Sequence, residues 1–283
     1  MSLTEISWID YLKKKVPKTK RVLCGIGDDC ALVSLRQKTA LLKSDTFIEG
    51  VHFELGKASY RTIGSRAVAR VLSDFAACAG EPEFIGISVG LPRYVSESNL
   101  KKILEGVLSL ASKYKFALIG GDTARSDKLF LDVWGLGKTD KFVSRSTAKV
   151  GDYIFITGKI GARKFHETFE PRIKEAKFLT KNFAVNAMID ITDGFVCDLY
   201  KLLKSSGKGA VLDQESVPAV DKESLYRGED YELIFTIDEK EKKLNVLNKK
   251  FHCVGRIKPP KFGYNFAKRG KLHKITPKGY THF

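Results

Sequence analysis

Residues 61–91 read RTIGSRAVARVLSDFAACAGEPEFIGISVGL, and this stretch predicts a helix followed directly by a strand. Apolar residues recur at helical spacing between Ile63 and Ala79, and Gly80 and Pro82 then stop the helix. The PEFIGISVGL segment that follows is an apolar run of strand length. The stretch therefore indicates a fold in which helices and strands alternate.

The same patterns extend in both directions along the chain. A second amphipathic helix is predicted over 99–114, followed by the short strand FALIG and the turn GGDT. Further strands are predicted at LFLDVWGLG, DYIFITGKIG, GAVLD and YELIFTI, with helices over 194–206 and in DEKEKKLNVLNKK, while 163–181 is basic and poorly periodic. Several neighbouring strands lack helical crossovers, which favours an α+β fold over a doubly wound parallel sheet. The polar segment KTDKFVSRSTAKVG predicts a boundary between domains 1–148 and 149–283.

The composition is that of a globular protein with a substantial core, since 43% of the 283 residues are hydrophobic and 29% are charged. No apolar run approaches the roughly 20 residues that a membrane span needs, and the opening MSLTEISWIDYLKKK is too charged for a signal peptide. We therefore expect a cytoplasmic protein with no membrane partner. The 5 cysteines form no CxxC pair, which predicts neither disulfides nor a zinc site but reduced, mostly buried packing residues.

The net charge of +16 raises nucleic acid as a partner. The lysines are scattered, however, without a single stripe or interleaved aromatic residues. We therefore predict no nucleic-acid partner, and a basic nucleic-acid-binding protein stays as an alternative.

Aspartates concentrate in five short segments, GIGDDCAL, KSDTFIEGVHF, VLSDFAA, IGGDTARS and MIDITDGFVCDL, which are expected at the ends of strands or next to helices. A single Asp in such a place is usually structural, because it accepts backbone N–H bonds. Several carboxylates that converge would repel one another unless cations neutralised them, and Mg²⁺ suits such hard oxygen ligands. No P-loop, GxGxxG turn or protein-kinase catalytic loop occurs, so phosphate handling would depend on another scaffold and on metal ions.

In chain order, GIGDDCAL, SDTFIEGVHF, RAVARVLSDFAACAGEP, GGDT, SRSTAKVGDYIFITGKIG, MIDITDGFVCDL, RGEDYELIFT and VGRI resemble the thiamine-monophosphate kinase family. Its superfamily includes aminoimidazole ribonucleotide synthetase and selenophosphate synthetase and binds ATP without a P-loop. The resemblance implies two α+β domains, the first with strands at a homodimer interface, and transfer of the ATP γ-phosphate to thiamine monophosphate. Another ATP-dependent synthetase of the superfamily stays as an alternative.

The resemblance also implies roles for particular residues. It implies several Mg²⁺ ions held by Asp29, Ser44, Asp45, Asp74, Asp122, Asp190 and Asp193, and catalysis by Asp29, Asp45, Asp74, Asp122 and Asp193. It implies ATP contacts from Gly121, Asp122, Arg145 and Thr192, and substrate contacts from His52, Glu229 and Tyr280. From the residues alone, His52 reads as a strand histidine, Arg145 and Glu229 as surface charges, and Tyr280 as a packing aromatic.

Some positions depart from the family pattern. Lys43 stands where relatives usually have a small hydroxyl residue, which removes a side-chain metal contact and introduces an ammonium. Leu104 stands where relatives often have a tyrosine near the nucleotide. Thr192 replaces a common serine, Arg227 replaces the first glycine of a GGED motif, and the segment after Gly161 is short.

Overall fold

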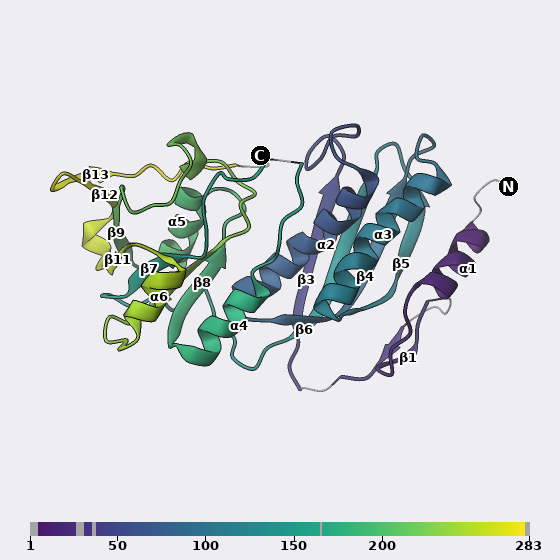
Figure 1. Cartoon of the computed structure of the whole chain (residues 1–283), viewed down its shortest axis with the longest axis horizontal. Coiled ribbons are helices and arrows are strands. Elements are labelled where there is room, and N and C mark those ends of the chain that lie inside the picture. The colour runs from purple at the N-terminus through teal and green to yellow at the C-terminus, as the bar shows by residue number, and fades with distance from the viewer. Residues whose placement is uncertain (1–4, 27–30, 36–37, 165, 281–283) are drawn as a thin grey trace. The chain divides into compact units, whose positions relative to one another are not determined.

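The computed structural model describes residues 5–26, 31–35, 38–164 and 166–280, and its elements fall into two compact units (Figure 1). Unit 1 comprises Met1–Phe75, Glu81–Thr139 and His166–Glu170. Unit 2 comprises Ala76–Gly80, Asp140–Phe165 and Pro171–Phe283. Both units mix helices with sheets, which confirms the predicted α+β class.

Unit 1 is built on a four-stranded sheet in the order β3-β6-β4-β5. The β4 and β5 strands are parallel and are connected through α3, whereas β6 pairs antiparallel with β3 and β4. The helices α2 and α3 lie over one face of this sheet (Figure 1). The elements are α1 (Glu5–Lys15), β1 (Val22–Cys24), β2 (Leu32–Val33), β3 (Leu41–Ile48), α2 (Tyr60–Ala77), β4 (Glu81–Leu91), α3 (Glu97–Tyr114), β5 (Ala117–Arg125) and β6 (Phe130–Lys138).

Close contact between α2 and α3 holds the helical layer of unit 1 together. A Cβ atom added at Gly64 of α2 would lie 2.0 Å from the carbonyl oxygen of Ile103, and one at Gly106 of α3 would lie 2.0 Å from that of Arg61. Only glycine therefore allows the two backbones to come this near. The helix predicted in residues 61–91 and the strand after it are both confirmed as α2 and β4.

Unit 2 is built on a seven-stranded sheet in the order β13-β12-β9-β11-β7-β10-β8, in which only β12 and β9 pair in parallel. The strands are β7 (Tyr153–Ile156), β8 (Val185–Asp190), β9 (Gly209–Asp213), β10 (Leu233–Ile237), β11 (His252–Lys258), β12 (Tyr264–Lys268) and β13 (Lys271–Lys274). The helices are α4 (Ile173–Asn182), α5 (Phe195–Ser206) and α6 (Leu244–Lys250), with short 3-10 turns at Glu223–Leu225 and Pro260–Phe262.

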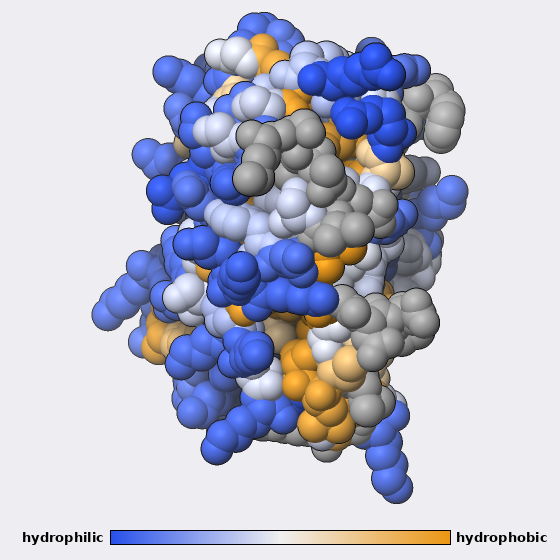
Figure 2. Space-filling model, turned by 90° about the vertical axis from the view of Figure 1, so that its right-hand side faces the viewer, coloured by the Kyte–Doolittle hydropathy of each residue, from blue (hydrophilic) through white to orange (hydrophobic). Residues whose placement is uncertain are grey.

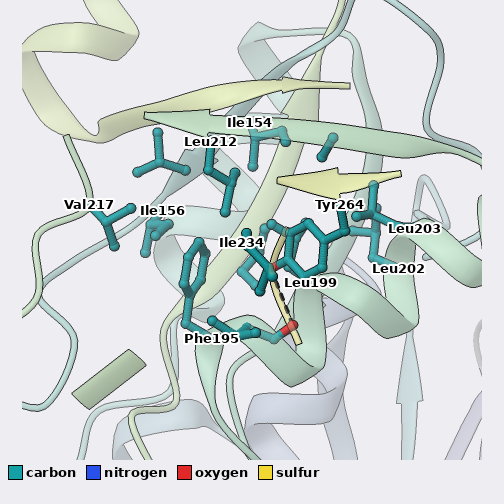
Figure 3. Close-up of a cluster of buried hydrophobic side chains, with 14 of the residues drawn as sticks. Ile154, Ile156, Phe195, Leu199, Leu202, Leu203, Leu212, Val217, Ile234 and Tyr264 are labelled. Carbon is teal, nitrogen blue, oxygen red and sulfur yellow. Dashed lines mark hydrogen bonds between the residues drawn. The ribbon is translucent and has the colours of Figure 1, made fainter. Parts of the chain in front are cut away.

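The helix α5 is anchored by the apolar core of unit 2 (Figure 3). Phe195, Leu199 and Leu202 point from α5 toward a cluster of sheet residues that includes Ile154, Ile156, Leu212 and Ile234. The Tyr264 hydroxyl donates to the carbonyl oxygen of Val196 at 3.2 Å. Full burial of each such aliphatic or aromatic side chain stabilises the fold by about 1.5–3 kcal/mol. The N-terminus of α5 and the turn before it are therefore held in a fixed position.

Two expectations about the acidic segments are wrong. The GGDT segment, predicted as a turn, lies inside β5, and Asp45, expected near the end of a strand, lies inside β3. Two successive glycines suggest a turn, but Gly121 is required by packing instead. Its φ is 152°, and a Cβ there would lie 1.7 Å from the carbonyl oxygen of Ile87 on β4.

Other differences have local causes. The stretch 163–181 contains α4, whose buried residues Ile173, Ala176 and Leu179 form too narrow an apolar face to show a clear period. The helix predicted in DEKEKKLNVLNKK is only the seven-residue α6. Four cysteines, Cys24, Cys78, Cys197 and Cys253, are unbridged but half-buried rather than buried, and Cys30 lies outside the described residues. None of the helices in the described part of the chain has the length and apolar character of a membrane span.

Candidate active site

In unit 1, β3 and α2 bring two predicted metal ligands together. Asp45 lies on β3 and Asp74 on α2. The Lys43 Nζ atom is 3.0 Å from Oδ2 of Asp74, and the Arg70 Nε atom is 3.5 Å from Oδ2 of Asp45. Lys43 and Asp45 are two residues apart on the strand and so share a face, while Arg70 and Asp74 are one helical turn apart. The strand and the helix thus form a cluster of two carboxylates and two cations.

The electrostatics of this cluster show that the two carboxylates interact. Burial raises the pKa of Asp74, Lys43 opposes the shift, and the neighbouring charge of Asp45 raises the pKa further. The side chains of Asp45 and Asp74 are 24% and 26% exposed, so both remain within reach of solvent. Within the described residues, no group of three His, Cys, Asp or Glu side chains is placed to hold a metal ion. The Asp45 and Asp74 pair does fit Mg²⁺, which commonly binds through one or two carboxylates together with water and substrate phosphates.

A cavity of about 1090 Å³ lies at the other edge of the sheet in unit 1. Its lining includes Gly121 and Asp122 of β5, Leu104 of α3, Trp8 of α1 and Trp134 of β6. Figure 2 views the side of the molecule on which α1 and β5 lie, and hydrophobic residues there form small patches among hydrophilic ones. The cavity combines apolar walls with charged groups, since Asp10, Lys13 and Asp122 also line it, as a site for an aromatic ring with a charged substituent would require.

Within one copy of unit 1, Asp122 does not join Asp45. Asp45 is paired across the sheet with Val133, Ile87 and Gly121 in turn, which puts it three strand spacings, or about 14 Å, from Gly121. Asp122 belongs to the next row, and so points to the opposite face from Asp45. The sheet therefore separates two carboxylates that the resemblance assigns to one metal cluster.

Ser44 and His52 are also placed by local geometry. Ser44 alternates with Asp45 along β3 and donates its hydroxyl to Oδ1 of Asp132 at 3.4 Å, on the face opposite Asp45. His52 is buried, its ring stacks on Phe47 at 5.7 Å between centroids, and its Nδ1 accepts from the backbone N–H of Ile48 at 3.0 Å. A neutral His52 ring would therefore carry its proton on Nε2.

In unit 2, the turn between β8 and α5 carries three predicted site residues. Asp190 ends β8 and is buried, and Thr192 and Asp193 follow. Asp198 holds this turn, because its Oδ2 accepts from the backbone N–H groups of Thr192, Asp193 and Gly194 at 2.8, 2.8 and 3.2 Å. Burial raises the pKa of Asp198, and the hydrogen bond from Lys201 opposes that shift.

Lys201 lies one turn along α5 and pairs with two carboxylates. Its Nζ donates to Asp193 and, at 2.7 Å, to Oδ1 of Asp198. Burial lowers the pKa of Lys201, but the hydrogen bonds to Asp193 and Asp198 outweigh this effect and raise it. The Asp193 carboxylate is therefore fixed in orientation and partly neutralised before any ligand binds.

The two predicted substrate residues of unit 2 converge on the same turn. The backbone N–H of Glu229 donates to the carbonyl oxygen of Thr192 at 2.9 Å, and that of Tyr280 donates to Asp193 at 2.9 Å. Glu229 has a φ of 69° and Tyr231 a φ of 52°, which are rare for residues with side chains and are often found at functional sites. Three segments far apart in the sequence thus meet at one turn.

Beside this turn lies a buried acidic pair that the sequence analysis did not identify. Asp230 Oδ1 accepts from the backbone N–H of Gly161 at 2.6 Å, while its Oδ2 is buried without a hydrogen-bond partner. Burial raises the pKa of Asp230 to about 6. Glu232 is held by Arg172, whose Nε donates at 2.8 Å, and by the Thr157 hydroxyl at 2.6 Å. The pair anchors the segment after β7 to the start of β10.

Two predicted site residues do not join these groups. Asp29 lies outside the described residues. The carbonyl oxygen of Arg145 accepts from the hydroxyl of Ser206, the last residue of α5, at 3.0 Å. Since α5 has 12 residues and is therefore about 18 Å long, the Arg145 backbone lies at the opposite end of this helix from Thr192.

The sequence analysis missed Asp198, Lys201 and Asp230. A signal existed for Asp198, because a carboxylate near the start of the predicted helix can accept backbone N–H groups of the TDG turn before it. Lys201 lies three residues later and so on the same face of that helix. Asp230 had no comparable signal, because its burial depends on segments distant in the sequence.

Comparison with known proteins identifies relatives over the whole chain. Residues 27–139 match the family described as AIR synthase related protein, N-terminal domain, and residues 149–253 match its C-terminal domain. The thiamine-monophosphate kinase of Buchnera aphidicola subsp. Acyrthosiphon pisum is 34% identical, with 100% of both chains covered. The crystal structure of thiamine-monophosphate kinase from Stenotrophomonas maltophilia is similar with a TM-score of 0.78 at 26% identity, covering 96% of this chain and 99% of that one. The structure of AaThiL complexed with AMPPCP and TMP gives a TM-score of 0.75 at 29% identity, covering 100% and 99%.

Proposed function

The chain belongs to the thiamine-monophosphate kinase family, and from this premise we propose that it makes thiamine diphosphate by direct in-line transfer of the ATP γ-phosphate to thiamine monophosphate. Like its relatives, it is an ATP-dependent phosphotransferase. The observation that carries the mechanistic proposal is the convergence in unit 2 of Thr192 and Asp193, Glu229 and Tyr280 at one turn. The residues proposed to bind phosphate and those proposed to bind substrate are thus held by the same turn between β8 and α5.

The proposed reaction depends more on the positioning of the two substrates than on proton transfer. The attacking oxygen belongs to a phosphate group that is already ionised near pH 7, so no strong general base is required. Bound Mg²⁺ would neutralise the charge of the phosphate oxygens. The chain's part is to hold the two anions in line, with Glu229, Tyr280 and His52 orienting thiamine monophosphate. Its net charge of +16 favours the approach of both anions.

We propose the same metal ligands that the resemblance implies. Asp45 and Asp74 of unit 1 are the best supported, because they face one another and remain partly exposed. The other proposed metal ligands are Asp29, Ser44, Asp122, Asp190 and Asp193. The proposed ATP contacts are Gly121, Asp122, Arg145 and Thr192. In this assignment the cavity at Gly121, Asp122 and Leu104 takes the nucleotide.

A homodimer is part of the proposal. Asp122 lies on the edge strand β5, and Asp45 on the other edge strand, β3, with their side chains on opposite faces. A second copy whose β5 edge lay beside the β3 edge of the first would bring the strand that carries Asp122 next to the strand that carries Asp45, in the closed two-fold arrangement that is commonest among oligomers. Light scattering at micromolar concentration is expected to give the mass of two chains, and a monomer mass would contradict this arrangement.

We also keep the division into domains 1–148 and 149–283 and a cytoplasmic location as part of the proposed function. The first domain would bind ATP and Mg²⁺ and dimerise, and the second would complete the active site. ATP and thiamine monophosphate are the proposed partners, with no nucleic acid and no membrane.

A steady-state assay of ADP release tests the function. Thiamine monophosphate, but not unphosphorylated thiamine, is expected to stimulate ADP formation, because the acceptor is a phosphate oxygen. Equal turnover with free thiamine would reject the proposal. ADP release that no thiamine compound stimulates would favour another synthetase of the superfamily or, if ADP release is absent altogether, a nucleic-acid-binding protein.

A further inference from the structure

Lys43 places a side-chain cation directly beside Asp74, one of the two carboxylates proposed as metal ligands in unit 1. It stands on β3, two residues before Asp45 on the same face, and its ammonium is 3.0 Å from Oδ2 of Asp74. Its side chain is 34% exposed, so the ammonium lies at the border of the protein and solvent beside Asp74. The position is thus open to ligands rather than closed off in the core.

The two cations of the cluster differ in how firmly they are held. Arg70 is 14% exposed and also stacks over the ring of Phe47, with its guanidinium carbon 5.7 Å from the ring centre. Phe47 itself is buried, so Arg70 is part of the packing of unit 1. Lys43 is a more exposed side chain on the edge strand β3, 34% exposed against 14% for Arg70. Arg70 therefore supports the packing of unit 1, whereas the ammonium of Lys43 can contact a bound ligand.

A bound ammonium and a divalent ion compete for Asp74. The ammonium of Lys43 and a divalent ion repel one another, so an ammonium 3.0 Å from Oδ2 of Asp74 weakens the binding of Mg²⁺ to the same carboxylate. Among the described side chains of this cluster, the charges of Lys43 and Arg70 offset those of Asp45 and Asp74. The positive charge of Lys43 therefore reduces the attraction of the Asp74 carboxylate for a divalent ion.

We propose that the Lys43 ammonium serves as a built-in cation of the phosphate site and replaces one divalent ion beside Asp74. This inference rests on the proposed kinase function, since it assigns the cluster to phosphate neutralisation. The chain then binds one divalent ion fewer than it would with a small neutral residue at position 43, and the lysine supplies that part of the positive charge to the reacting phosphates.

The test counts metal ions directly. Binding of Mn²⁺ to the full chain, measured without nucleotide from the electron paramagnetic resonance signal of free Mn²⁺, is compared for the parent protein, Lys43→Ser and Lys43→Gln. Both substitutions are expected to add one Mn²⁺ site per chain or to tighten binding at least tenfold. Lys43→Arg keeps the charge and is expected to match the parent protein.

A matched control is Lys138→Ser, on β6 of the same sheet. Lys138 also pairs with a carboxylate, Glu81, at 3.8 Å, and the two side chains are 30% and 32% exposed. This variant removes a lysine of similar exposure without touching the Asp45 and Asp74 pair, so its Mn²⁺ binding should equal that of the parent protein.

The outcomes separate this inference from the proposed function. Unchanged Mn²⁺ number and affinity in both Lys43→Ser and Lys43→Gln, or the same gain in Lys138→Ser, would overturn the role of Lys43. Neither result would alter the ADP assay, which decides the kinase function by itself. Each variant's melting temperature is recorded with and without Mn²⁺, and a larger Mn²⁺-induced rise for Lys43→Ser than for the parent supports the inference.

Discussion

The carboxylates of unit 1 and unit 2 are assembled in different ways. Asp45 and Asp74 come from a strand and a helix and meet only through the packing of α2 on the sheet. Asp190, Asp193 and Asp198 belong to one continuous strand, turn and helix, which Asp198 holds together through three backbone N–H groups. In each unit a lysine pairs with a proposed metal ligand, Lys43 with Asp74 and Lys201 with Asp193. The difference predicts that the proposed ligands of unit 1 can be changed with little loss of stability, whereas in unit 2 the stability of the turn depends on a separate carboxylate, Asp198, next to the proposed ligand Asp193.

The largest effect on kcat is expected when Asp45, Asp74 or Asp122 is replaced by Asn. Each substitution keeps the shape of the side chain but removes a carboxylate, and we expect kcat to fall by about 10²–10³. The apo melting temperature should stay close to that of the parent. For Asp45 and Asp74, losing a partly exposed ion pair costs little and their mutual repulsion is relieved. Asp122 is exposed, and Asn keeps an oxygen that can accept from the backbone N–H of Thr123. Measurements of kcat against Mg²⁺ concentration, together with apo melting curves, check both statements.

The control for these variants is Asp127→Asn, which changes an exposed carboxylate outside the proposed site and should leave kcat unchanged. Near-normal kcat in all three site variants would show that these aspartates are scaffold. A large drop of the apo melting temperature with an unchanged Mg²⁺ dependence would lead to the same conclusion.

The next effect concerns the support of the unit 2 turn. Asp198→Ala leaves the N–H groups of Thr192, Asp193 and Gly194 without their acceptor, and we expect a loss of about 2–3 kcal/mol in the free energy of unfolding. Asp193→Asn breaks only a partly exposed ion pair with Lys201 and should cost less than about 1 kcal/mol. Urea unfolding of both apo variants measures the contrast. Equal losses would erase the proposed distinction between the supporting and the functional carboxylate.

Asp230 gives an effect on stability whose size depends on pH. Its pKa is raised from 3.8 to about 6 in the folded state, so the folded chain binds this proton more tightly than the unfolded chain does. The contribution of Asp230 to stability is therefore largest below pH 3.8 and is lost as the pH rises through about 6. Asp230→Asn, which resembles the protonated group, should raise the free energy of unfolding at pH 8 by up to about 3 kcal/mol and change it little at low pH.

Asp221→Asn is the control for this prediction. Hydrogen bonds from the hydroxyl and the backbone N–H of Ser224 lower the pKa of Asp221, so its stabilising effect is present above the usual pKa and is lost toward acid. Its substitution should therefore shift stability in the opposite direction at pH 8. A pH profile of unfolding that is identical for the parent and for Asp230→Asn would contradict the raised pKa of Asp230.

The smallest effect concerns the cavity of unit 1. Leu104 lines the same cavity as Gly121 and Asp122, and Leu104→Tyr offers an aromatic face to a nucleobase there. We expect ATP to bind more tightly by about 0.5–1.5 kcal/mol, measured by calorimetry. An unchanged or weaker affinity with an unaltered apo melting temperature would mean that the base does not contact position 104.

Much of the fold could be predicted from the sequence where the signal is local. The helix in residues 61–91, the strand after it and the end of α5 at Gly207 follow from apolar spacing and from a glycine in the left-handed conformation. The helix α4 and the strand that contains GGDT could not be predicted from the sequence, because both depend on packing against distant segments.

The arrangement of the candidate site residues also depends on segments that are distant in the sequence. The meeting of Asp193 with Glu229 and Tyr280 was expected only through the resemblance, since no local pattern links three distant segments. The ion pair between Lys43 and Asp74 depends on how α2 lies on β3, and the separation of Asp45 from Asp122 depends on strand order. Spacing along the chain contains neither piece of information.

The contact of α2 with α3 at Gly64 and Gly106 has a mechanical consequence. No side chain separates the two backbones there, so the helices cannot slide or rotate past one another without breaking van der Waals contact. Asp74 belongs to one of these helices and Leu104 to the other. The helix pair therefore fixes the spacing between Asp74 and the cavity wall at Leu104, and that spacing is set by the main chain rather than by any side chain that a ligand could push aside.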